Sequence, residues 1–250
     1  VSTANSIQTQ PLLKLGLIVL RGVGQVMFQG HAATGLFFLA GIAYGSPLMA
    51  AGALIGAIVG PAVAYLLKFD RDEIEQGIYG FNPTLVGIAL LFYLKLAPMT
   101  WVLLLAGCVT ATLITYLARR FLKFPTYTGP FIVATWAMLM LAHSMAGRSI
   151  DLIPASPPRM PSGFIESVLA GEAEVMFGAN SWTGFLFLVG IALSNWRHAV
   201  IALLGSVVGT LFAYYHHDPE STISIGIYGY NSALAAMAIY LWRESLNLSI

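Results

Sequence analysis

The hexapeptide Gly77-Ile78-Tyr79-Gly80-Phe81-Asn82 returns 149 residues later as Gly226-Ile227-Tyr228-Gly229-Tyr230-Asn231. Each copy follows the most polar loop of its part of the chain and opens an apolar run, at residues 83–94 and 232–242. Two copies of one Gly-aromatic-Gly-aromatic-Asn entrance to an apolar helix indicate an internal duplication. We therefore interpret the rest of the sequence as two related units.

The composition indicates a protein embedded in lipid. Of 250 residues, 58% are hydrophobic and only 9% are charged, whereas globular proteins carry about 25% charged residues. The mean hydropathy is +0.78. Because so few charges are available to cover a water-soluble fold, the natural solvent of most of the surface is a bilayer. The net charge of +1 argues against a nucleic-acid partner, which needs a dense basic face.

The first unit is expected to contain one half-crossing helix and five membrane crossings. The half-crossing segment, residues 11–28, is interrupted by Lys14, Arg21 and Gln25, so it suits an interfacial or re-entrant position. The crossings are predicted at residues 32–45, 47–67, 83–96, 100–118 and 128–142. A proline-rich linker at residues 147–161 then separates the first unit, residues 1–146, from the second, residues 162–250.

The second unit repeats the first at a constant offset. Val26-Met27-Phe28 returns as Val175-Met176-Phe177, and about a third of the positions between 20 and 94 are identical without a gap. Because five crossings is an odd number, the second unit must enter the membrane from the opposite side, which makes an inverted repeat. The counterparts of the fourth and fifth crossings fall beyond Ile250, so the second half is expected to be incomplete in this chain.

Basic residues favour an orientation with the N-terminus in the cytoplasm, because cytoplasmic loops carry an excess of Lys and Arg. In this orientation most of the basic residues that follow the first helix fall on the cytoplasmic side: Lys68, Arg71, Arg119, Arg120, Lys123, Arg197 and Arg243. Lys95, Arg148 and Arg159 fall outside.

Gln25 and Glu174 occupy equivalent positions in the two units, and each is followed three residues later by a phenylalanine, Phe28 or Phe177. Polar side chains inside a membrane are costly and usually functional. This spacing places an oxygen acceptor beside an aromatic face on one side of a helix. The alternative is that Glu174, like its neighbour Glu172, caps or solvates a helix end.

A second pair of candidates follows each hexapeptide. Phe81 and Leu85 stand four residues apart, as do Tyr230 and Leu234, so each pair lies on one helix face. Such a stripe is also typical of ordinary packing. The asparagine that closes each hexapeptide is expected to cap the start of its helix.

The segment Phe124-Pro125-Thr126-Tyr127-Thr128-Gly129-Pro130-Phe131 introduces another apolar run. Its prolines leave backbone carbonyls without a helical partner, so these carbonyls must bind neighbours or a solute. Thr128 adds a hydroxyl at the same place. An ordinary helix that begins at a proline is the alternative.

The histidines do not form a metal-binding pattern. His31 and His143 are isolated, and in His216-His217-Asp218 adjacent side chains diverge, so a loop at the membrane interface is the better interpretation. The sequence contains no phosphate-binding loop, nucleophile elbow or zinc-protease helix. We expect no cofactor and no enzymatic activity.

Residues 77–90, their second copy and the 124–131 segment together resemble the urea transporter family, and the likeness covers nearly the whole chain in order. The resemblance implies a homotrimer in which each protomer forms its own pore between two inverted halves. It also implies a pore lined by the re-entrant helix and by the third and fifth crossings.

Matched by motif, Gln25 and Glu174 resemble the polar residues at the two ends of the family's selectivity filter, and Thr128 resembles its mid-pore threonine. The apolar walls that compress the path into a slot are matched by Phe28, Phe81, Leu85, Val175, Phe177, Tyr230 and Leu234. Two positions depart from the family pattern, because Phe124 replaces a leucine and Tyr230 replaces a phenylalanine.

The resulting hypothesis is passive, channel-like transport of urea across the inner (plasma) membrane of a bacterium, by a protein surrounded by membrane lipid. Urea is flat and neutral, with four N–H donors and one carbonyl acceptor, so it needs a thin slot and a row of acceptors. Three alternatives remain: a pore for ammonia or another small neutral amide, a non-conducting membrane scaffold, and an integral-membrane enzyme.

Overall fold

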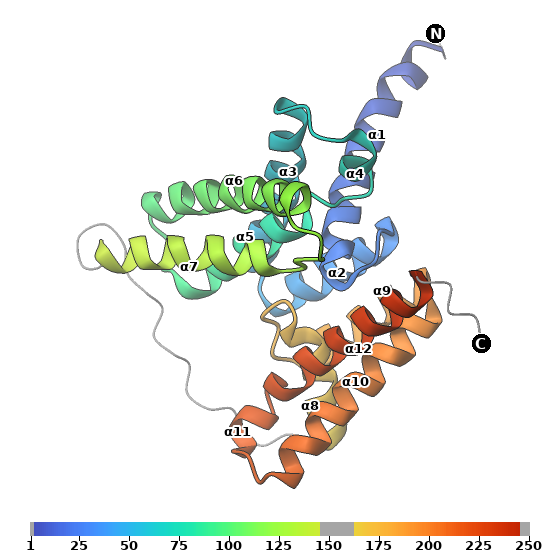
Figure 1. Cartoon of the computed structure of the whole chain (residues 1–250), viewed down its shortest axis with the longest axis vertical. Coiled ribbons are helices and arrows are strands. Elements are labelled where there is room, and N and C mark those ends of the chain that lie inside the picture. Colours follow the sequence, from blue (N-terminus) through green and yellow to red (C-terminus); the bar gives the residue numbers. More distant parts are fainter. Residues whose placement is uncertain (1–2, 146–162, 246–250) are drawn as a thin grey trace. The chain divides into compact units, whose positions relative to one another are not determined.

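Helices form most of the chain that this computed structural model describes, residues 3–145 and 163–245 (Figure 1). The all-helical class predicted from the sequence is therefore confirmed, while the inverted relation of the two halves stays a prediction. The linker predicted at residues 147–161 lies outside the described residues, together with Arg148 and Arg159. The chain forms two compact units, residues 1–36 with 51–153 and residues 37–50 with 154–250.

Before the linker, the helices are α1 (Thr3–Gly24), the 3-10 turn η1 (Gln25–Met27), α2 (Ala32–Gly45), α3 (Pro47–Leu66), α4 (Arg71–Glu75), α5 (Phe81–Tyr93), α6 (Pro98–Phe121) and α7 (Gly129–Ser144). After it come α8 (Phe164–Glu174), α9 (Ser181–Ser194), α10 (Trp196–Tyr215), α11 (Glu220–Ile223) and α12 (Ile227–Ser245).

Three of the described helices, α3, α6 and α10, are long and apolar enough to cross a membrane alone. The stretch Leu12–Met27 and α2 form a fourth candidate span, bent by 74° at the break between them. Such a bend suits a broken span or a re-entrant loop, in keeping with the interrupted segment at residues 11–28. Helices α5, α7 and α9 are apolar but shorter. The 13 residues of α5 rise only about 20 Å, less than the hydrocarbon core of about 30 Å.

The duplication recurs in the backbone geometry inside each unit. Gly77 has a φ of 83° and its counterpart Gly226 a φ of 87°. Phe28 and its counterpart Phe177 both have a φ of 60°. Left-handed backbone is uncommon for residues other than glycine. Matching departures at matching positions indicate that the two units follow one local plan.

Close approaches between backbones explain the glycines that both units share. A Cβ added to Gly22 of α1 would lie 2.9 Å from the Gly80 Cα, and a Cβ added to Gly171 of α8 would lie 3.0 Å from the Gly229 Cα. These distances leave almost no room for a side chain. The glycines of each hexapeptide thus let α1 or α8 cross directly over it.

Candidate functional site

A cavity of about 360 Å³ lies in the first unit. It forms where η1 meets the start of α5, the C-terminal turns of α6 and the loop before α7. Four residues predicted to line the transport path contribute to its wall: Gln25, Phe28, Phe81 and Thr128. Sequence reasoning did not assign three other lining residues to the path: Arg119, Lys123 and Tyr127.

Gln25 offers an oxygen acceptor at this cavity. Its side-chain nitrogen Nε2 donates a 3.0 Å hydrogen bond to the backbone oxygen of Gln76. Only the NH₂ group of an amide can donate to a carbonyl, so this bond fixes the orientation of the Gln25 amide. The oxygen Oε1 is therefore the end that can accept an N–H group from a solute.

Phe28 and Tyr127 form one aromatic wall of the cavity. Their ring centroids are 5.5 Å apart and their planes meet at 76°, an edge-to-face arrangement that aromatic rings favour. Both residues have left-handed backbone, with φ values of 60° and 43°. Tyr127 was not predicted from the sequence because the direction of its side chain depends on the left-handed backbone at this residue. In the sequence only Pro125 and Gly129 indicate that the chain reverses its direction here.

The two candidates at the start of α5 have different environments. Phe81 is partly exposed and lines the cavity. Leu85 is only 2% exposed and does not belong to the cavity lining. A role for Leu85 in the transport path therefore stays a prediction, whereas its packing role is plain.

Asn82 does not cap α5, so that expectation was wrong. The residue before the helix is Gly80, which makes no side-chain capping bond, and Asn82 lies inside the first turn, fully buried. Its Nδ2 donates to Thr115 Oγ1 of α6 at 3.0 Å and to the Tyr127 backbone oxygen at 3.4 Å. Its Oδ1 accepts from the Phe131 backbone N–H at 3.1 Å. The side chain is directed at α6 and the loop before α7 instead of the helix start.

Thr128 stands immediately before α7 and lines the cavity. Its side chain makes no capping hydrogen bond to the helix, and Pro130 occupies the first turn. Because proline has no backbone N–H, this helix start needs fewer capping partners. Thr128 therefore lies at the cavity wall, and the helix that follows it begins with a proline in its first turn. The two interpretations drawn from the sequence thus hold together.

A carboxylate neutralises the arginine at the cavity. Arg119 donates to Glu73 Oε1 from Nε at 2.9 Å and also from Nη2, and the Tyr79 hydroxyl donates to Glu73 Oε2 at 2.6 Å. Burial, reinforced by this carboxylate, raises the pKa of Tyr79, which lies between α4 and α5. Tyr79 therefore stays a neutral donor. In the second unit the corresponding hydroxyls of Tyr228 and Thr222 lie 3.4 Å apart.

The candidates of the second unit resemble their counterparts in local geometry. The Phe177 N–H donates to the Glu174 backbone oxygen at 3.0 Å, as the Phe28 N–H donates to the Gln25 backbone oxygen at 3.0 Å. The remaining candidates are partly or fully buried at the end of α8 and the start of α12: Val175, Tyr230 and Leu234. Their contribution to a transport path stays a prediction.

Glu172 does not solvate a helix end, contrary to the alternative drawn from the sequence. Its exposed fraction is 0%, and neither carboxyl oxygen has a hydrogen-bond partner within the described residues. Its counterpart in the first unit, Val23, is equally buried. Glu172 is buried because α9, α10 and α12 all pack against α8. Glu174 is only partly buried.

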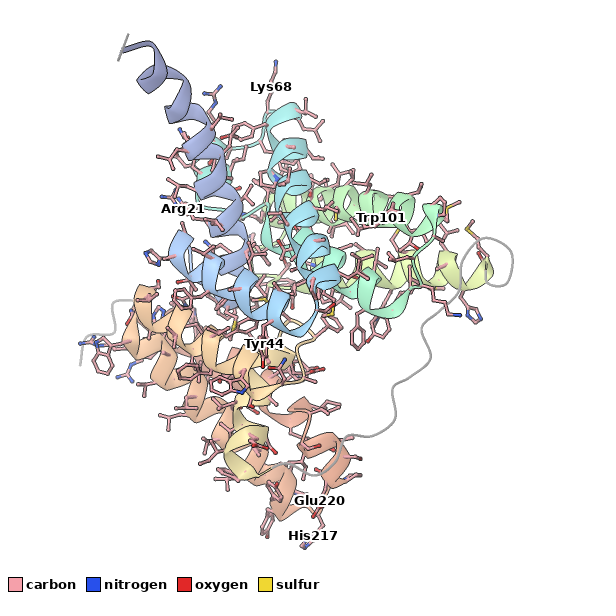
Figure 2. The ribbon with its side chains drawn as sticks, turned by 180° about the vertical axis from the view of Figure 1, so that it is seen from behind. Arg21, Tyr44, Lys68, Trp101, His217 and Glu220 are labelled. Carbon is pink, nitrogen blue, oxygen red and sulfur yellow. The ribbon has the colours of Figure 1, made fainter. Side chains whose placement is uncertain are left out.

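Among residues 3–145 and 163–245, no group of three His, Cys, Asp or Glu side chains could hold a metal ion. Residues 216–218 belong to the polar turn between α10 and α11, in line with the loop predicted there. Figure 2 shows His217 and Glu220 at this turn, where α10 ends.

Comparison with known proteins identifies the family. The family described as "Urea transporter" matches this chain over residues 17–247. The chain belongs to the urea transporter family. Relatives named "Urea transporter 1" include the proteins of Rattus norvegicus, Ovis aries and Mus musculus, which are 30%, 29% and 28% identical to this chain. Each match extends over 240 residues, 88% of this chain and 62% of the relative.

The chain thus spans less than two thirds of the length of these relatives. Membership in the family confirms the resemblance found in the hexapeptides and the 124–131 segment. The family is one of transporters, not enzymes, so the alternative of an integral-membrane enzyme is not favoured.

Proposed function

We propose that this chain provides a passive, channel-like path for urea across a bacterial plasma membrane, formed between two inverted repeats. The observation that carries the proposal is the acceptor oxygen of Gln25 in one cavity with the Phe28 and Phe81 rings. Membership in the urea transporter family supports the choice of solute.

The cavity matches the chemistry of urea. Its flat face can pack against the Phe28 and Phe81 rings, while its N–H groups need oxygen acceptors. Gln25 Oε1 supplies one acceptor and the Thr128 hydroxyl a second. Because urea carries no charge, its movement down a gradient needs no coupling ion.

Ions fit the same cavity poorly. Apolar rings cannot replace the water that surrounds a cation or an anion, so entry would cost most of the hydration free energy. Arg119 is held in an ion pair with Glu73, which limits its attraction for anions. We therefore expect the aromatic wall to select neutral solutes. The oxygen acceptors should in turn favour solutes that carry N–H donors.

The second unit would supply the other end of the path. In this proposal Glu174 plays the part of Gln25, and the apolar wall continues through Val175, Phe177, Tyr230 and Leu234, with Leu85 behind Phe81. The proposal also includes a homotrimer in membrane lipid, with the N-terminus of each protomer in the cytoplasm.

The full-length protein in proteoliposomes provides the test, with flux of urea, thiourea, ammonia and sodium measured separately. We expect urea flux that does not depend on a sodium gradient and exceeds sodium flux by far. Gln25→Leu should reduce urea flux, whereas Gln76→Leu should not, because Gln76 contributes only its backbone oxygen.

Sodium-driven accumulation of urea would contradict a passive channel. Conduction of ammonia without urea would favour the ammonia pore, and the lack of any solute flux from the full-length protein would favour the non-conducting scaffold.

A further inference from the structure

We propose that Asn82 is a positioning residue of the transport path, which holds the loop before α7 so that Tyr127 supports the Phe28 ring and limits the width of the slot. The inference rests on the proposed function, because it takes the cavity of the first unit to be part of the urea path. It assigns Asn82 and Tyr127 a role in solute selectivity.

The hydrogen bonds of Asn82 have only one consistent assignment. The Thr115 hydroxyl donates its single proton to the Ala111 backbone oxygen at 2.7 Å, so it can only accept from Asn82. The Phe131 N–H can only donate, so it must meet Oδ1. Asn82 therefore has its amide nitrogen towards α6 and its oxygen towards α7, and both ends of the amide are fixed.

These bonds link the start of α5 to both sides of the reversal that carries Tyr127. Asn82 contacts the Tyr127 backbone oxygen on one side and the Phe131 N–H of α7 on the other. Left-handed backbone at a tyrosine persists only where its surroundings hold it. Because Asn82 is fully buried, water has little access to its end of these bonds.

The position of Tyr127 in turn limits the position of Phe28. The edge of one ring lies against the other at a centroid distance of 5.5 Å, and both rings line the cavity. If the loop relaxes, the Phe28 ring loses this support and the slot widens. Urea gains little from a wider slot, whereas N,N′-dimethylurea, which is broader in its plane, gains more. Selectivity, and not only rate, should therefore depend on Asn82.

The test measures the ratio of urea to N,N′-dimethylurea permeability for the full-length protein in proteoliposomes. This ratio does not depend on how many channels are folded. Asn82→Ala and Thr115→Val each remove a buried hydrogen bond at the start of α5, and Tyr127→Leu removes the ring that contacts Phe28, so each should lower the ratio by about threefold or more.

Thr112→Val controls for the loss of a buried hydroxyl in α6, although Thr115, unlike Thr112, also lines the cavity. Thr112 lies one turn before Thr115 in α6, is equally buried, and bonds the Cys108 backbone oxygen of its own helix as Thr115 bonds Ala111. It has no bond to Asn82 in the described structure. Its variant should keep the wild-type ratio.

Proportional loss of both permeabilities in Asn82→Ala, or an unchanged ratio in Tyr127→Leu, would overturn the inference while the proposed function stands. If Asn82→Ala does not fold, Thr115→Val and Tyr127→Leu still decide the matter, because they leave Asn82 in place. Absence of urea flux in the wild type overturns the proposed function, and the inference with it.

Discussion

The Tyr79 hydroxyl donates a 2.6 Å hydrogen bond to the Glu73 carboxylate, six residues before it in the chain. Thr222 and Tyr228 repeat this spacing in the second unit, with two hydroxyls in place of a hydroxyl and a carboxylate. In the first unit Arg119 also reaches Glu73 from α6. The first copy of the motif thus carries a charged network beside the cavity.

Glu73→Gln should destabilise the first unit by about 1–2 kcal/mol, because Glu73 accepts from both Tyr79 and Arg119. Glu75→Gln is the control: Glu75 pairs with Lys14, whose side chain is 57% exposed, and such pairs contribute about 0–1 kcal/mol. Thermal unfolding of the purified protein in detergent measures both. Equal unfolding temperatures for the two variants would show that the Glu73 network adds nothing beyond a surface ion pair.

The raised pKa of Tyr79 predicts a loss of stability in alkaline solution. The unfolded chain releases the Tyr79 proton near its ordinary pKa of 10.0, whereas burial keeps the proton on the folded protein. The protonated Tyr79 side chain therefore makes its full contribution to the free energy of unfolding below pH 10. This contribution is lost as the pH rises towards the folded pKa, at up to about 1.4 kcal/mol per pH unit. Tyr79→Phe should lack this component, so its unfolding temperature should approach that of the wild type above pH 10. Parallel curves for the two proteins would contradict the assignment.

Replacement of two glycines of α1 by alanine should change the free energy of unfolding in opposite directions. A Cβ on Gly22 would meet Gly80 at 2.9 Å, so Gly22→Ala must push two backbones apart, at a cost of about 1–3 kcal/mol. Gly16 has nothing within 4 Å of the same position, so Gly16→Ala should stabilise the helix by about 0.5–1 kcal/mol. Thermal unfolding distinguishes them, and a stabilised Gly22→Ala would disprove the close crossing of α1 over the hexapeptide.

Glu174→Ala should impair urea flux far more than Glu172→Ala when both are normalised to the amount of folded protein. Glu174 is the counterpart of Gln25 and is partly exposed, whereas Glu172 is buried within the second unit. Proteoliposome flux is the measurement. Equal and negligible effects would remove Glu174 from the proposed filter.

Glu172→Val should raise the free energy of unfolding. A buried carboxyl group without a hydrogen-bond partner among the described residues costs about 1–3 kcal/mol, and Val23 shows that valine fits the equivalent position of the first unit. A higher unfolding temperature for Glu172→Val than for the wild type is the expected result. A lower one would mean that the carboxyl group has a partner in the assembled protein.

The duplication and the helical class could be predicted because they depend on residue identity and on local periodicity. The site could be predicted only in part. Gln25, Phe28, Phe81 and Thr128 each belong to a recognisable motif and line one cavity, while their part in transport stays a prediction. Whether Leu85 reaches the path depends on how α5 rotates, and no sequence pattern states that rotation.

Asn82 and Glu172 show why the rest escaped prediction. An asparagine at a helix start usually caps it, but the partners of Asn82 lie 33, 45 and 49 residues away, and only tertiary structure brings them together. Glu172 belongs to a short helix whose acidic residues suggested solvent. Its burial follows from three helices that pack around α8.

The left-handed backbone at Phe28 and Phe177 also restricts what evolution or a protein engineer can place at these positions. Side chains branched at Cβ are strongly disfavoured there, so valine, isoleucine and threonine are poor replacements, although all three are apolar or small enough. Leucine, methionine and tyrosine keep an unbranched Cβ and fit the same backbone. Redesign of the proposed urea path for larger solutes should therefore begin with Phe28→Leu or Phe177→Leu and omit the β-branched alternatives from the library.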